Sequence, residues 1–279
     1  MSTKHPFTPH HLNATPDDLS GNHGIGRYLL LPGSDGRARE IADQFENITV
    51  KSHPRAHNLY LGTISCGRKK IDVAAVASGM GCPSMEIILH ELFHLGAKRF
   101  LRIGTAGSLQ STVKIGHLVN VQASVRDENT TTCYAPLEVP AIASLEYASA
   151  ILLAAEKLGL SDQLHTGMAH CKSSLYAREF GAGPRSKEND DYIDLLADYG
   201  VLATEMETAA LFIQSQYYNH LLSTDNKAPH RVLSGAILAI IATPEKFELS
   251  PDVVAATTQD SIQLALEAVK TLAIQELAD

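Results

Sequence analysis

The sequence predicts an α/β sandwich built around a largely continuous sheet. Short runs of strand-forming residues alternate with longer runs whose apolar residues recur at helical spacing, which is the pattern of such folds. Of the 279 residues, 44% are hydrophobic and 19% are charged, so the chain can bury a substantial core. No loop-like stretch is long enough to be a domain linker, and we expect residues 1–279 to form a single domain.

The first strand is predicted at residues 27–31 and leads through a glycine turn into an amphipathic helix. The apolar residues of that helix recur at the i, i+3, i+4 and i+7 positions, at Ala38, Ile41, Ala42 and Phe45. A pair of strands follows at residues 58–64 and 71–78. Glycines then open a helix with Pro83 in its first turn, and this helix ends at Gly96.

The later part of the chain continues the alternation. Further strands are predicted at residues 99–103, 118–124, 165–169 and 231–241. Further helices are predicted at residues 145–158, 192–199, 206–218 and 252–278. Two stretches that collect Gly, Pro, Ser, Asn and charged residues, 181–191 and 220–230, are predicted to be loops.

Charge and cysteine usage exclude several classes of protein. Lys and Arg total 23 and Asp and Glu total 31, so the net charge is −8 and no broad nucleic-acid surface is expected. The four cysteines form no C-x-x-C pair, and the apolar stretch 236–242 is far too short for a membrane span. The polar residues 1–18 lack the apolar core of a secretory signal. We therefore expect a cytoplasmic protein with reduced thiols and no membrane partner.

Glycine-containing turns follow three of the predicted strands and bring Arg37, Arg102 and Thr105 with them. Ligands of α/β sheets gather at the carboxyl ends of strands, where glycine lets backbone N–H groups approach an anion closely. Guanidinium groups match phosphate bidentately, and a threonine hydroxyl adds a donor. We interpret these turns as one phosphate site assembled from several strand ends. The alternative for each arginine alone is an ordinary solvated or paired charge.

Glycine patterns for other phosphate ligands are absent. No G-x-G-x-x-G lies between a predicted strand and helix, and no P-loop is present, so dinucleotide and ATP sites are not predicted. Residues 204–208 stand at the start of a predicted apolar helix, with Glu207 in its first turn, and acidic residues such as Glu205 and Glu207 are favoured there by the helix dipole. A carboxylate there also suits the paired hydroxyls of a ribose, because it accepts hydrogen bonds only. The residues alone leave both interpretations open.

A complete H-E-x-x-H stands at His90, Glu91 and His94, the pattern of a zinc metalloprotease helix. However, Met85, Ile88, Leu89, Leu92 and Leu95 fall on one face at 100° per residue, and this places both histidines on the outward side. The third ligand of the extended motif is absent as well. We therefore predict no metal.

Together, the glycine turns, the arginines and the acidic segment resemble the nucleoside phosphorylase family, with its uridine phosphorylases the most similar branch. The resemblance runs from about His11 to the C-terminal helix, and its most specific pieces are residues 100–107, 134–141 and 205–207. It implies a three-layer α/β/α sandwich with a central mixed sheet. It also implies a homodimer, or a hexamer of three dimers, whose sites are shared between subunits and need no cofactor.

The resemblance also implies residue roles, transferred position by position. The phosphate-binding residues would be Gly33, Arg37, Arg102 and Thr105, with Arg55 of a neighbouring subunit. The ribose-binding residues would be Thr105, Met206 and Glu207, with His11 of the neighbour. The catalytic residues would be Arg102, Glu207 and Arg37. Base contacts are assigned to Ala106, Gly107, Leu175, Arg178 and Glu205. The implied reaction is attack of phosphate on the anomeric carbon of a nucleoside, with uridine as the first substrate to test.

The departures from the family pattern concern mainly the base. Residues 175–180 lack the Gln that reads uracil in uridine phosphorylases, which leaves Arg178 and Arg185 either as its replacements or as solvated loop charges. The strand around residues 235–243 carries no acid to protonate a purine, which disfavours a purine nucleoside phosphorylase. Ala56 stands where bacterial uridine phosphorylases have a Glu that helps to bind a potassium ion, so no such ion is expected here. A nucleosidase that uses water and a nucleoside-binding protein with an altered base pocket are the remaining alternatives.

Overall fold

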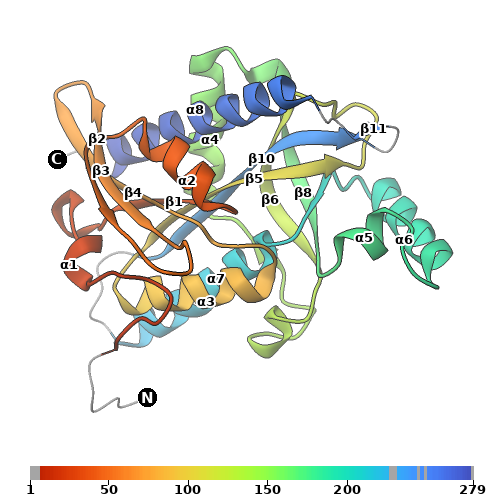
Figure 1. Cartoon of the computed structure of the whole chain (residues 1–279), viewed down its shortest axis with the longest axis horizontal. Coiled ribbons are helices and arrows are strands. Elements are labelled where there is room, and N and C mark those ends of the chain that lie inside the picture. Colours follow the sequence, from red (N-terminus) through yellow and green to blue (C-terminus); the bar gives the residue numbers. More distant parts are fainter. Residues whose placement is uncertain (1–6, 226–230, 244–245, 248–249, 278–279) are drawn as a thin grey trace.

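The fold is organised around an eleven-stranded mixed sheet with helices on both faces (Figure 1). A computed structural model describes residues 7–225, 231–243, 246–247 and 250–277. The strands are β1 (Tyr28–Pro32), β2 (Glu46–Lys51), β3 (Leu59–Cys66), β4 (Lys69–Val76), β5 (Arg99–Ser108), β6 (Leu118–Asp127), β7 (Ala141–Ile142), β8 (Leu164–Lys172), β9 (Ala203–Glu205), β10 (Leu233–Thr243) and β11 (Lys246–Phe247). The helices are α1 (Pro16–Leu19), α2 (Asp35–Ala42), α3 (Cys82–His94), α4 (Leu145–Leu158), α5 (Leu175–Glu179), α6 (Ser186–Asp198), α7 (Thr208–Asp225) and α8 (Pro251–Glu276).

The strand order brings the ends of three parallel strands to one edge. Strand β1 lies between β4 and β5 and is parallel to both, so the residues that follow β1 and β4 emerge beside the carboxyl half of β5. On the other side of β5, strand β10 pairs with both β5 and β6, and β8 and β9 connect β6 back to β5. Strands β5, β10, β6, β8 and β9 therefore close into a ring, while β1, β4, β3 and β2 extend from β5 as an open sheet.

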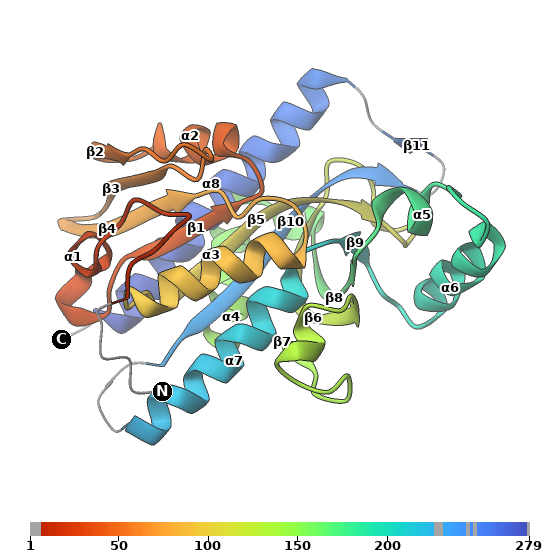
Figure 2. The same cartoon turned by 60° about the horizontal axis from the view of Figure 1, so that its bottom comes forward.

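Two apolar cores cover the two faces of the sheet. Along β1, the side chains of Leu29 and Leu31 enter the core beneath α3 and α7, whereas Tyr28 and Leu30 enter the core beneath α2, α4 and α8. Figure 2 shows α3 and α7 side by side on their face of the sheet. This arrangement confirms the predicted sandwich with a central mixed sheet. None of the helices among the described residues is both long and apolar enough to cross a membrane.

The two predicted loops are largely helical. Residues 186–191 form the first half of α6, and residues 220–225 form the end of α7. Both predictions were wrong because polar composition was taken to mean a loop, whereas a surface helix needs only a narrow apolar stripe. The remainder of the second stretch, residues 226–230, lies outside the described residues. The end predicted for the last helix, Ala278, also lies outside them, and α8 is described to Glu276.

Strand β5 is longer than predicted. Residues 104–107 were expected to form a turn after the strand, but they remain in β5 and pair in parallel with β10. The prediction took glycine as a turn signal, whereas Gly104 is required here for close packing. A Cβ at Gly104 would lie 2.9 Å from Cδ2 of Leu238 and 3.0 Å from Nη2 of Arg102. The glycine therefore leaves the space in which the Arg102 guanidinium lies.

Candidate active site

The turns that follow β1 and β4 lie against each other. The hydroxyl and the backbone N–H of Ser78 donate to the carbonyl of Pro32 at 3.1 and 2.8 Å, which joins the two strand ends. A Cβ at Gly33 would lie 3.6 Å from the carbonyl oxygen of Gly79. Gly81, two residues after Gly79 in the same turn, has a positive φ of 82°, and its N–H donates to the buried carboxylate of Glu207. Two of the three glycine turns predicted to form one site, those after β1 and β4, are thus adjacent.

Arg102 lies in the middle of β5 and is only 3% exposed. Its Nη2 donates to Oε2 of Glu207, and its Nε lies 3.3 Å from Oε2 of Glu205. The Nε and Nη1 atoms of Arg102 have no hydrogen-bond partner among the described residues. Buried donors rarely stay unpaired in folded proteins, so Nη1, which unlike Nε does not face Glu205, indicates a ligand position.

Strand β9 explains how two glutamates reach Arg102. Because β9 is antiparallel to β5, with Thr204 opposite Gly107, the chain after Thr204 runs back along β5 toward Arg102. Glu205 accepts the backbone N–H groups of Glu207 and Thr208 at 2.8 and 2.9 Å, together with the Thr208 hydroxyl. Its carboxylate therefore caps α7 and fixes the backbone of Glu207. The sequence suggested a base contact for Glu205, but the structure gives both of its oxygens partners of their own.

Glu207 has a different environment from Glu205. Its Oε1 accepts the N–H of Gly81 at 2.5 Å, and its Oε2 faces Arg102. Burial raises the pKa of Glu207 above the ordinary value of 4.5, and the negative charge of Glu205 raises it further, although Arg102 acts in the opposite direction. The pKa of Glu205 is lowered despite its burial, because Arg102 and the donors at the start of α7 stabilise its charge. Glu207 is thus the member of the pair that takes a proton first.

Arg37 enters the same region from α2. Ser34 caps this helix by accepting the Arg37 N–H at 3.4 Å, so the first turn of α2 presents Arg37 beside the end of β1. The half-buried guanidinium has no hydrogen-bond partner among the described residues and borders a hollow of about 690 Å³ between α2 and the first turns of α8. Burial lowers the pKa of Arg37, and the positive charge of Arg102 lowers it further. The two guanidinium groups are thus near enough for their charges to interact, while the hollow beside Arg37 is lined by residues of α2 and α8.

The remaining strand-end residues lie along the same edge. Thr105 and Gly107 are half-buried near the end of β5, and Ala106 between them is buried in the core. Met206 is half-buried in the short segment between β9 and α7. The predicted positions on β5 and after β9 are about a hundred residues apart in the sequence, and the β5–β9 pair, in which Gly107 lies opposite Thr204, brings the two segments together.

The two residues expected from a neighbouring subunit lie at the surface of this chain. Arg55 is exposed in a turn at residues 53–56, and His57 ties that turn to the end of β4 by donating from Nδ1 to the carbonyl of Ala77 at 2.8 Å. The His11 ring is held by Glu91 of α3, with Nδ1 2.8 Å from Oε1. Neither residue contacts Arg102 or Glu207 of its own chain through a hydrogen bond among the described residues.

The arginines proposed for the base differ from each other. Arg178 donates to Oδ1 of Asp127 at 2.8 Å and to Oδ1 of Asn189 at 2.7 Å, and it stacks 4.7 Å above the ring of Tyr192. It is thus neither free nor a solvated charge. Arg185 pairs with Glu188, and both side chains are largely exposed, as the surface-charge alternative predicted. Leu175, which begins α5, is 37% exposed.

A buried polar cluster beside β9 was not predicted. Lys172 is 1% exposed, and its Nζ contacts the Thr204 hydroxyl at 2.9 Å and pairs with Glu179. His170 joins the cluster from the same strand, with Nδ1 3.1 Å from the Thr204 hydroxyl. The segment around Lys172 is polar in sequence, with His170 before it and Ser173 and Ser174 after it, so nothing local marked this lysine as buried. Its partners are far away in sequence and therefore could not be identified.

The H-E-x-x-H residues have structural contacts. Glu91 is 4% exposed and accepts the backbone N–H groups of His10 and His11 at 2.9 and 3.0 Å. His90 and His94 lie on the outer side of α3, where both rings contact the Tyr218 hydroxyl of α7. No group of three potential ligands suited to a metal occurs within the part of the chain that the structure describes.

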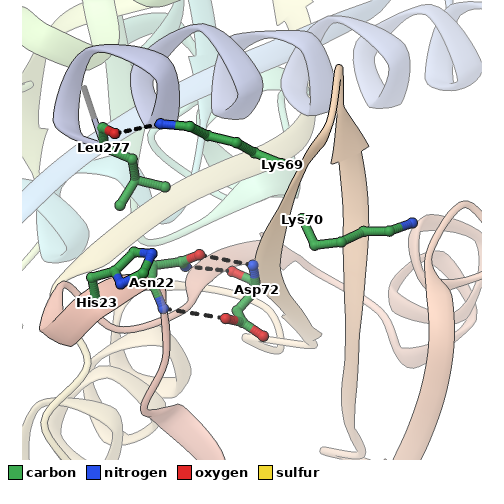
Figure 3. Close-up of a pocket in the computed structure, with 6 residues that line it drawn as sticks. All are labelled: Asn22, His23, Lys69, Lys70, Asp72 and Leu277. Carbon is green, nitrogen blue, oxygen red and sulfur yellow. Dashed lines mark hydrogen bonds between the residues drawn. The ribbon is translucent and has the colours of Figure 1, made fainter. Parts of the chain in front are cut away.

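A pocket at the opposite ends of the strands, near the start of β4, is excluded as the site (Figure 3). Its volume is about 440 Å³, and it is lined by Asn22, His23, Lys69, Lys70, Asp72 and Leu277. Because Lys69 begins β4, the pocket lies at the end of the strand far from Gly79. Asn22 and Asp72 are joined by three hydrogen bonds of 2.9, 2.9 and 3.2 Å, and Lys69 donates to the carbonyl of Leu277 at 2.7 Å, so these groups hold neighbouring segments together.

Comparison with known proteins gives a consistent result. A sequence profile of the phosphorylase superfamily matches residues 27–221. A uridine phosphorylase of Treponema pallidum (strain Nichols) is 32% identical over 254 residues, which cover 90% of this chain and 92% of the relative. A uridine phosphorylase of Thermococcus kodakarensis is 29% identical over 95% of this chain and 86% of its own length. A guanosine phosphorylase of Halorubrum lacusprofundi is 28% identical over 67% of this chain and 71% of its own length.

Proposed function

Since the chain belongs to the phosphorylase superfamily, we propose that it cleaves uridine with phosphate to give uracil and ribose 1-phosphate. It is an enzyme of the pentosyltransferase type, and its relatives support a nucleoside phosphorylase activity. One observation carries the proposal. Arg37 and Arg102 are close enough that the charge of Arg102 lowers the pKa of Arg37, and Arg102 also pairs with Glu207. An anion between the two guanidinium groups would thus lie beside a carboxylate suited to a sugar.

The phosphate would be held by Gly33, Arg37, Arg102 and Thr105. Nη1 of Arg102 has no hydrogen-bond partner among the described residues, so Arg102 can bind phosphate through it and keep its pairs with Glu205 and Glu207. A phosphate oxygen attacks the anomeric carbon, and the bond to the base breaks with its electron pair going to the base, which then takes a proton from the solvent. No covalent enzyme intermediate is required. The protein contributes alignment of the reactants and fixed charges around them.

Glu207 would accept hydrogen bonds from the ribose 2′ and 3′ hydroxyls while Gly81 and Arg102 hold it in place. Its negative charge also lies near the sugar ring, where positive charge develops in the transition state. Met206 would pack on the sugar. Glu205 would serve by fixing the backbone at Glu207, since its own oxygens are used at the start of α7.

A second copy of the chain would complete the site. Arg55 and His11 are the residues proposed to cross the subunit boundary, Arg55 to phosphate and His11 to the 5′ hydroxyl. The exposed position of Arg55 and the fixed ring of His11 are compatible with contacts outside the chain. We therefore propose a homodimer, alone or as part of a hexamer. A cytoplasmic location is proposed from the cysteine usage of the sequence, in which the four cysteines form no C-x-x-C pair.

Nucleoside binding is expected to weaken as the pH falls, and the loss should begin at a higher pH than the titration of a glutamate with the ordinary pKa of 4.5. The pKa of Glu207 is raised above 4.5, so as the pH falls its carboxylate is protonated earlier than a solvent-exposed one and accepts weaker hydrogen bonds. Calorimetric titration with uridine in the absence of phosphate, between pH 4 and 8, measures this. Glu207→Gln removes the titrating group and should flatten the profile. A wild-type loss of affinity that begins only below pH 4.5 would contradict the role of Glu207.

The second candidate function is a purine nucleoside phosphorylase, which the guanosine phosphorylase among the relatives supports. Uridine, thymidine and inosine, each incubated with and without phosphate, separate the candidate functions. The proposal predicts cleavage of uridine only with phosphate. Cleavage of inosine but not of uridine or thymidine, in the presence of phosphate, would favour the purine enzyme. Cleavage at the same rate with and without phosphate would indicate a nucleosidase. Binding without any cleavage would indicate a binding protein.

A further inference from the structure

Glu179 brings a carboxylate to the end of β5. It is the last residue of α5, and its Oε2 would lie 3.9 Å from a Cβ at Gly107. Gly107 pairs with Thr204, and the chain that follows Thr204 reaches Glu207 three residues later. The carboxylate therefore lies at the same strand ends as the proposed phosphate and ribose positions, on the side of Gly107 where a side chain is absent.

One oxygen of Glu179 is anchored and the other is not. Oε1 accepts the hydroxyl of Thr204 at 2.7 Å and pairs with Nζ of Lys172. Oε2 has no hydrogen-bond partner within the described residues, although the Glu179 side chain is only 14% exposed. The carboxylate is thus fixed in orientation through Oε1, and Oε2 is left to accept a hydrogen bond from water or from a ligand donor.

Lys172 explains why this carboxylate is tolerated. Its side chain is 2% exposed, and its Nζ reaches Thr204, Glu179 and the carbonyl of Glu205 at 3.4 Å. An ammonium group has three donors, so Lys172 has none left for a ligand. Its positive charge offsets that of Glu179, so the pair adds little net negative charge where a departing base gains electrons. Lys172 is thus a positioning residue.

We propose that Glu179 reads the base by accepting a ring N–H at its Oε2 atom, and this inference rests on the proposed function. An ionised carboxylate accepts hydrogen bonds only. Uracil at N3 and a 6-oxopurine at N1 each offer an N–H beside a carbonyl. Cytosine and adenine present a lone pair at the corresponding nitrogen, which would face the carboxylate unfavourably. The pocket therefore selects nucleosides whose base carries an O=C–N–H group, and it takes over the task of the absent Gln.

Glu179→Gln gives the sharpest test. Because Lys172 and Thr204 both need an acceptor at the anchored position, the amide oxygen of the new side chain stays there and its NH₂ turns to the base. The variant should then accept cytidine relatively better than wild type does. Calorimetric binding of uridine, 3-methyluridine and cytidine, without phosphate, measures the preference independently of turnover. Glu188→Gln, in an exposed pair with Arg185, is the matched control.

Wild type and the Glu188 variant are expected to bind uridine at least about 100-fold more tightly than 3-methyluridine or cytidine, the scale of losing a buried partner for a charged group. In Glu179→Gln the ratio of uridine to cytidine affinity should fall by about tenfold or more. Glu179→Ala, as a second variant, should lose the discrimination against 3-methyluridine. Thermal unfolding confirms that each variant is folded.

Two results separate the claims. Unchanged ratios in folded Glu179→Gln and Glu179→Ala would overturn the role of Glu179, even if uridine is cleaved with phosphate. Conversely, the expected shift in binding preference with no cleavage of any nucleoside would uphold the role of Glu179 and overturn the proposed reaction.

Discussion

Replacing Arg102 with alanine is expected to lower kcat/KM for phosphorolysis by about 30- to 1,000-fold, which corresponds to about 2–4 kcal/mol of transition-state stabilisation. Arg102 is buried, its Nη2 holds Glu207, and two further donors lack hydrogen-bond partners among the described residues. The variant loses the phosphate donors and the partner that orients the ribose-binding carboxylate. Steady-state rates at varied phosphate concentration measure the effect, and the apparent KM for phosphate should rise.

Arg102→Ala also leaves Glu205 and Glu207 without their cation, so loss of folding has to be separated from loss of catalysis. Breaking a buried ion pair from one side costs about 3–5 kcal/mol of stability. Arg99→Ala is the matched control, because Arg99 is 2% exposed, lies in the same strand and pairs with Glu276 far from the site. Both variants should be destabilised, yet only Arg102→Ala should lose activity per folded molecule. Equal activity per folded molecule in the two variants would remove Arg102 from the phosphate site.

Replacing Glu207 with glutamine is expected to lower kcat/KM for uridine by about 100-fold or more, because two hydrogen bonds to a charged acceptor are weakened at about 1.5–3 kcal/mol each. The shape of the side chain is kept, and the N–H of Gly81 retains an acceptor. With 2′-deoxyuridine, which lacks one of the two hydroxyls, the loss should be smaller. The ratio of the two kcat/KM values in each protein is the measurement.

Glu267→Gln is a suitable comparison for Glu207→Gln, because Glu267 is also a buried and paired glutamate but lies on α8 against Lys157. Its activity should match that of wild type. If Glu207→Gln reduced turnover of uridine and 2′-deoxyuridine by the same factor, the Glu207 carboxylate would not be the group that holds the 2′ hydroxyl.

The sequence predicted correctly those elements whose ends are marked by local residues, such as a glycine that stops a helix. Helix α4 begins and ends at the predicted residues, because Gly159 adopts the left-handed conformation, with φ of 71°, that stops it. Strand β9 is only three residues long and was missed, because its place in the sheet is set by β5 and β8 rather than by an apolar run of its own. Strand β2 was missed because its side chains are largely exposed at the sheet edge.

The site was predictable in part for the same reason. Arg37, Arg102 and Glu207 stand beside glycine turns or at a helix start, and the rule that ligands gather at the carboxyl ends of strands predicts from sequence that they lie together. The contact between Arg102 and Glu207 joins residues 105 positions apart, and that between Lys172 and Glu179 depends on how α5 folds back over β8. No local pattern encodes such pairings. The contacts of Glu179 therefore had to come from the structure.

The stoichiometry of the products tests the central claim most directly. Purified protein is incubated with uridine in phosphate and in phosphate-free buffer, and uracil and ribose 1-phosphate are both quantified by chromatography. We predict equal amounts of the two products with phosphate and neither without it. Uracil released together with free ribose, at a rate that does not depend on phosphate, would contradict the assignment of Arg37 and Arg102 to a phosphate nucleophile.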